Sequence, residues 1–233
     1  MERTMLMHES SHSHLAAEYA GKSAVYYGNA RKDYVALLPS DPSASILELG
    51  CGNGATGALA LQEKKCGRYI GIEMFEPMAR MAEEVLTKVH QGNVESMTLP
   101  YPAQSFDALI LSEVLEHLVD PETTLRSLTR LLKVGGRVFA SSPNVAHYKI
   151  IRNLLLGRFD YLESGPMDKT HLRWFTPRSF ARLFEQADIV VDQLAPHPIP
   201  SMKRALVMGL VGPRLSHIFW SQINLHGHRR HGA

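Results

Sequence analysis

The sequence has few cysteines, no long hydrophobic run and no excess of one charge. Its 233 residues include two cysteines, Cys51 and Cys66. These are too few for a disulfide framework, so a reducing cytoplasm is the expected compartment. No apolar run reaches the roughly 18–20 residues that a membrane span needs. The balance of 25 basic and 23 acidic side chains excludes a broad electrostatic field for nucleic acid.

The composition that is present is typical of a globular protein. The chain is 45% hydrophobic and 21% charged with a net charge of +2, which excludes intrinsic disorder. We expect one domain over residues 21–225, between flexible tails at 1–20 and 226–233. Histidines in both tails could bind metal, but solvated, frayed ends are the favoured interpretation.

Short apolar runs alternate with helical stretches between the tails. The predicted strands are 46–49, 69–72, 106–111, 137–141, 189–191 and about 221–225. The predicted helices cover 56–66 and begin again at Pro77, Pro121 and Pro177, with Gly67 closing the first and Gly135–Gly136 the third. This alternation predicts a doubly wound α/β domain with a mostly parallel sheet.

Ligands of such sheets bind beyond the carboxyl ends of the strands. The loops that should therefore line one crevice begin at Gly50, Glu73, Asn93, Ser112 and Ser142.

The turn Glu48–Gly54 follows a predicted strand and precedes a predicted helix. Its glycines permit a tight turn in which a ligand lies against main-chain N–H groups. Glu73 comes 19 residues after Gly54, close to the roughly 20-residue offset of a carboxylate that binds a ribose diol. A nucleoside is the expected ligand. The spacing also fits a relaxed dinucleotide fingerprint, so an NAD-dependent oxidoreductase stays open, as does a tight turn without a ligand.

Five motifs in order resemble those of the class I S-adenosylmethionine-dependent methyltransferases. They are residues 46–54, 71–74, 91–95, 106–117 and 131–138. The resemblance implies a Rossmann-like methyltransferase fold with seven strands, a lid insertion after strand five at about 145–175, and S-adenosylmethionine as the cofactor. No metal is required. The cofactor-binding residues that it implies are Tyr27, Arg31, Glu48, Gly50, Cys51, Gly52, Gly54, Glu73, Met74, Asn93, Val94, Ser112 and Glu113.

Further segments resemble a bacterial branch of methyltransferases associated with polysaccharide, O-antigen or other glycan biosynthesis. These are 26–31, 142–144 and 168–176, whereas the ubiquinone-type O-methyltransferases share 113–117. The resemblance implies a hydroxyl of a small molecule or glycan as the acceptor. It also shows one departure, because Asn93 stands where the family commonly has an aspartate. An amide oxygen can still accept from the adenine amino group, without the strength of a charge.

Two histidines are candidate bases for the acceptor. Methyl transfer from a sulfonium is an in-line displacement, in which the protein aligns the reactants and often removes a proton. His171 lies in the predicted lid, and an imidazole with a pKa near 6.5 suits that task; a capping role is the alternative. His117 follows the fourth strand, where fixing the turn is the alternative. Cys51 is interpreted as a small side chain that leaves room for the ligand.

Two segments bear on the acceptor and on partners. The predicted lid mixes basic and aromatic side chains, which would suit a phosphorylated or lipid-linked glycan above the methyl group. Residues 203–220 are apolar with a basic start, which suits contact with a membrane surface or cover for the acceptor site, although packing on the sheet is favoured. A non-catalytic nucleoside-binding module stays as a third function, and the oligomeric state is left open.

Overall fold

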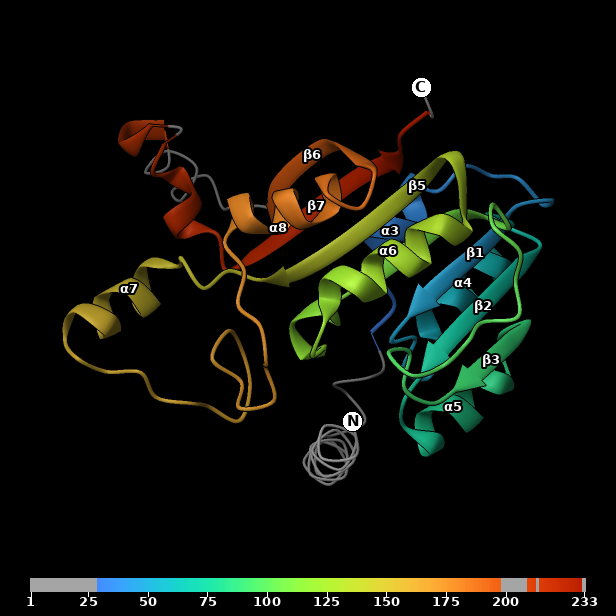
Figure 1. Cartoon of the computed structure of the whole chain (residues 1–233), viewed down its shortest axis with the longest axis horizontal. Coiled ribbons are helices and arrows are strands. Elements are labelled where there is room, and N and C mark those ends of the chain that lie inside the picture. Colours follow the sequence, from blue (N-terminus) through green and yellow to red (C-terminus); the bar gives the residue numbers. More distant parts are fainter. Residues whose placement is uncertain (1–28, 198–208, 213, 232–233) are drawn as a thin grey trace.

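The computed structural model describes residues 29–197, 209–212 and 214–231. Tyr27, the N-terminal tail and residues 203–208 lie outside the described residues. Seven strands form one sheet in the order β3-β2-β1-β4-β5-β7-β6 (Figure 1). All neighbours are parallel except β7, which runs antiparallel to β5 and β6. The predicted doubly wound, mostly parallel seven-stranded sheet is confirmed.

The strands and helices follow the predicted alternation. The strands are β1 Ser45–Leu49, β2 Arg68–Glu73, β3 Lys88–Gln91, β4 Phe106–Ser112, β5 Leu132–Pro143, β6 Ile189–His197 and β7 Gln222–Arg229. The α-helices are α3 Lys32–Leu37, α4 Ala55–Gln62, α5 Glu76–Glu83, α6 Pro121–Leu131, α7 Tyr148–Leu155 and α8 Pro177–Glu185. Two short 3₁₀ helices are η1 Leu115–His117 and η2 Ser216–Phe219.

The sheet separates two hydrophobic cores because successive residues of a strand point to opposite faces. In β4, Leu109 and Leu111 belong to the core under α6 and α8, whereas Ala108 and Ile110 belong to the core under α3, α4 and α5. Figure 1 shows α6 and α8 on one face and α3 and α4 on the other. Strands covered on both faces are buried along almost their whole length, which explains why they read as continuous apolar runs.

Helices α6 and α8 begin at the predicted prolines, Pro121 and Pro177, and each has a capping side chain before it. Asp120 caps α6 by accepting a hydrogen bond from the Thr123 N–H at 3.0 Å, and Pro121 takes the first helical position. Thr176 and Ser179 form a reciprocal capping box at the start of α8. These caps fix both helices over the same face of the sheet.

The prediction that Gly67 caps the first helix is wrong. Helix α4 ends at Gln62, and the residue that turns left-handed after it is Lys64, with φ of 55°. A Cβ on Gly67 would lie 2.0 Å from the Pro42 carbonyl oxygen. The glycine is therefore needed for a close approach of two backbone segments, which local sequence cannot reveal.

The prediction that Gly135 and Gly136 end the helix now labelled α6 is also wrong. Helix α6 ends at Leu131 and β5 begins at Leu132, so Gly135 and Gly136 lie inside the strand range. Gly135 adopts φ of 74°, where the pairing of β4 with β5 shifts register. Leu132 is buried and pairs with Phe106, and this tertiary contact extends the strand ahead of the glycines.

The last strand is longer than predicted. β7 runs from Gln222 to Arg229 and pairs with β5 as far as His228. The expected domain end at residue 225 is therefore too early, and residues 226–229 are strand rather than tail. The His226 ring packs at 5.3 Å from the Phe139 ring, which gives this histidine a structural role that its polar surroundings in the sequence concealed.

The segment between β5 and α8 forms the insertion predicted as a lid. It contains α7 and a loop that Figure 1 shows projecting away from the sheet. A bridge between Asn144 and Phe175 closes its base. Within the described ranges, no helix is long and apolar enough to cross a membrane.

Gly71 on β2 predicts a stability defect. A Cβ at this position would lie 2.5 Å from the Cys51 Sγ and 2.9 Å from the Leu86 Cδ1. We expect Gly71→Ala to lower the free energy of unfolding by about 1–3 kcal/mol, because it overpacks the contact between β2 and the glycine turn. Urea unfolding measures this. The control is Gly209→Ala, where an added Cβ meets nothing within 4 Å. Equal midpoints for the two variants would contradict the packing argument.

Candidate functional site

A cavity of about 640 Å³ opens at the carboxyl ends of β1, β2, β4 and β5. Its volume lies within the range of about 300–1,000 Å³ that is usual for small-molecule and cofactor sites. It is lined by four of the five predicted loop starts, Gly50, Glu73, Asn93 and Ser112, and by Pro143 in place of Ser142.

The glycine turn after β1 adopts backbone angles that favour glycine. Gly50, Gly52 and Gly54 have φ of 71°, 54° and 82°. The N–H groups of Gly50 and Cys51 donate to the Ile72 carbonyl of β2, at 2.8 and 3.2 Å. Gly54 is the N-cap of α4. The turn therefore holds its shape through the neighbouring strand and leaves the cavity side to a ligand.

Glu73 ends β2 and faces the cavity from beside this turn. Its Oε2 accepts from the Gly52 N–H and its Oε1 from the Phe75 N–H, both at 2.9 Å. Burial raises the pKa of this carboxyl, and hydrogen bonds from the backbone N–H groups of Phe75, Gly52 and Met74 oppose the rise. An ionised carboxylate has about four acceptor positions. The acceptor positions that these donors do not use can accept from the vicinal hydroxyls of a ribose, which fits a nucleoside-containing cofactor.

Glu48 lies beneath the glycine turn rather than at the rim of the cavity. Its Oε2 accepts from the Tyr69 hydroxyl at 2.8 Å. Burial raises the pKa of Glu48 to about 7, partly opposed by that hydrogen bond. Cys51 is buried next to it, and burial raises the pKa of this thiol well above its usual range. A thiol kept protonated is a poor nucleophile, in line with the interpretation of Cys51 as a space-saving side chain.

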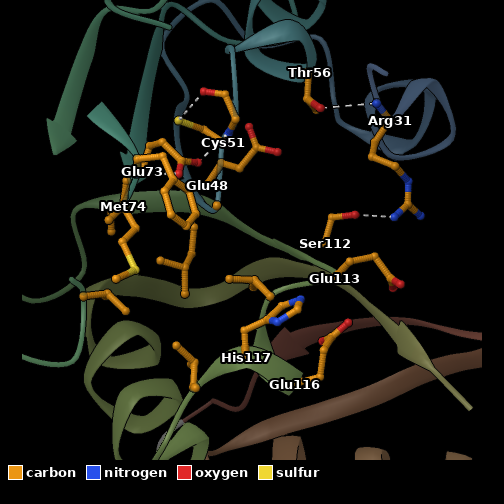
Figure 2. A pocket seen from close by; sticks show the side chains of 18 of the residues that line it. Arg31, Glu48, Cys51, Thr56, Glu73, Met74, Ser112, Glu113, Glu116 and His117 are labelled. Atoms are coloured by element: carbon orange, nitrogen blue, oxygen red, sulfur yellow. Dashed lines mark hydrogen bonds between the residues drawn. The ribbon is translucent and has the colours of Figure 1, made fainter. Parts of the chain in front are cut away.

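Arg31 lies at the side of the cavity and connects several elements. Its N–H donates to the Thr56 hydroxyl at 3.2 Å (Figure 2). Its guanidinium donates to the Ser141 hydroxyl at 2.8 Å. The guanidinium also donates to the Ser112 hydroxyl and forms a bidentate pair with Asp33. This anchoring fixes a positive charge at the cavity wall, where a ligand carboxylate would find a partner.

Asn93 uses its amide oxygen differently from the expectation. The oxygen accepts from the Glu95 N–H at 2.9 Å and so closes the turn after β3. Glu95 in turn accepts from the N–H groups of Val119 and Asp120 at 3.1 and 2.7 Å. The Asn93 oxygen therefore supports the turn that lines the cavity after β3.

The structure brings His117 and His171 together from positions 54 residues apart. Their ring centroids lie 4.8 Å apart, and both residues line the cavity. The His117 Nδ1 lies 3.2 Å from the Thr170 carbonyl oxygen, and the His171 Nδ1 lies 3.3 Å from that of Pro166. Each histidine thus supports the local backbone and also faces the cavity, so the structural and catalytic interpretations are compatible.

A buried glutamate, Glu116, and a partly buried one, Glu113, stand beside this pair. Figure 2 shows Glu113 and Glu116 with His117 across the cavity from Glu73. Burial raises the pKa of Glu116 well above its usual range, and repulsion from Glu113 adds to the rise. Glu113 adopts φ of 51°, a conformation unusual for a residue with a side chain. Burial also raises the pKa of Glu113.

Most predicted site residues meet in this cavity. Those that line it are Arg31, Glu48, Gly50, Cys51, Gly52, Glu73, Met74, Asn93, Val94, Ser112, Glu113, His117 and His171. Gly54 does not line it, because its place is the helix cap. The cavity is also lined by residues that were not predicted from the sequence, among them Glu116, Asp168, His197, Ser221 and Gln222. Asp168 and Glu116 stood inside recognised motifs, whereas the other three carry no local signal because β6 and β7 deliver them.

The basic and aromatic lid residues do not line this cavity, contrary to the expectation. The loop reaches it only through Gly165, Pro166, Asp168 and His171. Arg173 and Trp174 line a second hollow with α6 and α8. The Trp174 ring instead packs near the rings of Phe159 and Tyr161, at 6.1 and 6.2 Å. Stacking among themselves keeps these aromatics outside the cavity.

Comparison with known proteins decides between the nucleoside-binding families. A family model described as a methyltransferase domain matches residues 24–194. The chain belongs to this methyltransferase domain family. The family implies S-adenosylmethionine as the cofactor, as predicted, and the glycine turn with Glu73 fits its nucleoside. The match decides against the NAD-dependent alternative.

Two curated relatives match about half of the chain. The chain is 32% identical over 121 residues to the ubiquinone biosynthesis O-methyltransferase of Xanthomonas campestris pv. campestris, which covers 49% of each protein. It is 30% identical over 116 residues to the trans-aconitate 2-methyltransferase of Azoarcus sp. (strain BH72), covering 49% of this chain and 45% of the relative. The chain thus spans about half the length of these two curated relatives.

Solved structures share the fold. An S-adenosylmethionine-dependent methyltransferase from Mesorhizobium loti superposes with a TM-score of 0.62 at 16% identity, covering 87% of this chain and 99% of that one. The [4+2]-cyclase SpnF superposes with a TM-score of 0.60 at 18% identity, covering 94% and 92%. At such identities the likeness establishes the fold, and function has to be argued from the site.

The raised pKa of Glu48 predicts a pH-dependent stability. An unfolded glutamate titrates near 4.3, whereas Glu48 in the folded chain titrates at about 7 because it is buried. The folded state therefore holds this proton more tightly, and its contribution to stability is present below about pH 4 and lost as the pH rises through 7.

Glu48→Gln removes this titration and keeps an acceptor for the Tyr69 hydroxyl. At pH 8 we expect the variant to be more stable than the wild type by about 1–3 kcal/mol, and the difference should disappear near pH 4. Urea unfolding at a series of pH values measures it. A difference that does not change with pH would mean that Glu48 ionises in the folded chain without cost.

Proposed function

We propose that this protein transfers the methyl group of S-adenosylmethionine to a hydroxyl oxygen of a small molecule or glycan. One observation carries the proposal. A cavity with a nucleoside-binding carboxylate, Glu73, at one end has two facing imidazoles, His117 and His171, at the other. A cofactor held by its ribose would place its methyl group toward these imidazoles, where an acceptor has to lose a proton.

In this proposal the chain's own residues hold the cofactor along the carboxyl edge of the sheet. Glu73 accepts from the ribose hydroxyls, and the glycine turn lies against the nucleoside. Asn93 and Val94, which line the cavity after β3, bind the adenine. The fixed charge of Arg31 suits the carboxylate of the methionine moiety. Met74, Ser112 and Glu113 complete the contact surface.

Alignment is the main task that remains for the protein, because the sulfonium already carries its leaving group. A hydroxyl is a weak nucleophile until its proton is removed. The Nδ1 atoms of both histidines lie next to carbonyl oxygens, which can only accept. The hydrogen of each neutral ring is therefore on Nδ1, and the lone pair is on Nε2. We propose that removal of the acceptor's proton depends on His171, with His117 beside it.

Two observations bear on the class of acceptor, and each favours a different one. The names of the relatives, a ubiquinone biosynthesis O-methyltransferase and a trans-aconitate 2-methyltransferase, favour a small molecule. The segments 142–144 and 168–176 resemble the glycan-associated branch, which favours a sugar hydroxyl. Three polar residues line the cavity from its far strands: His197 on β6, Ser221 just before β7 and Gln222 at the start of β7. Their polar groups can donate to or accept from several hydroxyls.

His171→Ala tests the proposal on the acceptor side. We expect an unchanged affinity for S-adenosylhomocysteine and a kcat lowered about a hundredfold or more, because the change acts on proton removal and not on the cofactor. Calorimetry measures the affinity, and release of S-adenosylhomocysteine with a panel of hydroxylic acceptors measures turnover.

The companion variant is His117→Ala. Because His117 also supports the Thr170 backbone, it should lower the melting temperature together with activity. Near-normal turnover of His171→Ala would move the proton-removing role to His117. Near-normal turnover of both variants would contradict the assigned role of the pair.

A further inference from the structure

Glu116, His117 and His171 form a cluster that the cofactor does not need. The first two come from η1 and the third from the loop before α8. One carboxylate oxygen and one ring nitrogen of each histidine all lie within 4.8 Å of one another. All three residues line the cavity at its acceptor end. Their chemistry and their spacing are those of a metal-binding group of ligands.

The two rings are held as metal-binding histidines usually are. Each Nδ1 faces a main-chain carbonyl, of Thr170 at 3.2 Å and of Pro166 at 3.3 Å. A histidine that binds a metal commonly donates its other N–H to such a carbonyl or to a carboxylate, which fixes the ring and its tautomer. The Thr170 hydroxyl also contacts the His117 Nδ1 at 3.4 Å and donates to the Asp168 carboxylate at 2.7 Å. The outer support of the cluster thus extends to a buried carboxylate.

The environment of Glu116 is a second, independent reason to place a cation at this cluster. Its side chain is 1% exposed, and its Oε2 accepts from the Ser142 hydroxyl at 3.2 Å. Its Oε1 is buried and has no hydrogen-bond partner among the described residues. A buried polar atom without a partner costs free energy. A cation between this oxygen and the two imidazoles would satisfy it.

We propose that Glu116, His117 and His171 bind one divalent transition-metal ion at the acceptor end of the cavity. Two imidazoles and one carboxylate favour ions such as Zn²⁺, Fe²⁺ or Mn²⁺ over Mg²⁺ and Ca²⁺, which prefer oxygen ligands. Three protein ligands leave at least one coordination position open, as in catalytic metal sites. The open position faces the cavity, where an acceptor hydroxyl can enter.

The role of this ion rests on the proposed function. A hydroxyl oxygen that binds the ion has a lowered pKa and releases its proton to solvent. The oxygen then forms a bond to the methyl carbon as the bond from that carbon to sulfur breaks. The products are the methyl ether, S-adenosylhomocysteine and one proton, and no oxidant or reductant is needed. The histidines contribute to proton removal by holding the ion.

Metal binding is measured directly on the full chain, without turnover. The protein is stripped with a chelator, dialysed and titrated with Co²⁺, whose visible absorption reports its ligands, and then with Zn²⁺ in competition. We expect one equivalent of Co²⁺ with a ligand-field band that Zn²⁺ abolishes. His171→Ala and Glu116→Gln should each lose that band and weaken its binding about a hundredfold or more. Thermal melts check that each variant is folded.

Histidines elsewhere in the chain, including His8, His12 and His14, are intact in both cluster variants, so loss of the band in these variants assigns it to the cluster. The control removes a histidine outside the cluster. His228→Ala removes a ring that binds Asp192 on β6, far along the chain from the cluster, and should leave the band unchanged. A band of equal intensity in the wild type, His171→Ala and Glu116→Gln would overturn the proposal. Glu116→Gln preserves the shape of the side chain, so it tests the site even if His171→Ala is unstable. His171→Ala likewise tests the site if Glu116→Gln is unstable.

Activity separates this inference from the proposed function. Methyl transfer to a hydroxyl that is lost in chelator and restored by Zn²⁺ or Mn²⁺ supports both. Full transfer in the chelator-treated protein would leave the function standing and overturn the metal site. A confirmed metal site in a protein that binds S-adenosylhomocysteine but methylates no hydroxylic acceptor would leave the site standing and overturn the function.

Discussion

The Glu73 carboxylate holds together the two loops on which the cofactor end of the cavity depends. One oxygen accepts from Gly52 in the turn after β1, and the other accepts from Phe75 at the start of α5. The turn can only approach β2 because Gly71 lacks a side chain at the contact with Cys51. A single buried charge thus positions the main-chain N–H groups and keeps acceptor positions of its own toward the cavity.

The opposite end of the cavity is organised by contacts between distant segments. Main-chain N–H groups of Leu172 and Arg173 donate to the Glu116 carbonyl at 2.8 and 3.0 Å, which joins the loop before α8 to η1. This junction is what places His171 next to His117. The two ends differ in chemistry because one presents a carboxylate braced by N–H donors and the other presents imidazoles beside a carboxylate with an unpartnered oxygen.

Local signals in the sequence predicted six of the seven strands, the starts of the helices at prolines and the glycine turn, because each depends on residues close in the chain. The helices that begin at Pro121 and Pro177 were predicted for this reason. Contacts between distant segments were beyond such signals. Gly67 meets Pro42, Leu132 extends β5 through its pairing with Phe106, and β7 continues into the histidines at the end of the chain. The unpartnered oxygen of Glu116 is likewise a property of the fold, although the residue stood inside a recognised motif.

Ligand calorimetry on the wild type and on Glu73→Ala tests the central claim that this edge of the sheet binds S-adenosylmethionine through its ribose. We predict that S-adenosylhomocysteine binds, that NADH does not, and that Glu73→Ala weakens binding by about 1.5–3 kcal/mol because a charged acceptor is lost. Asn93→Ala should cost less, since it removes a neutral acceptor. Binding of NADH without S-adenosylhomocysteine, or equal affinity of the wild type and Glu73→Ala for S-adenosylhomocysteine, would contradict this account.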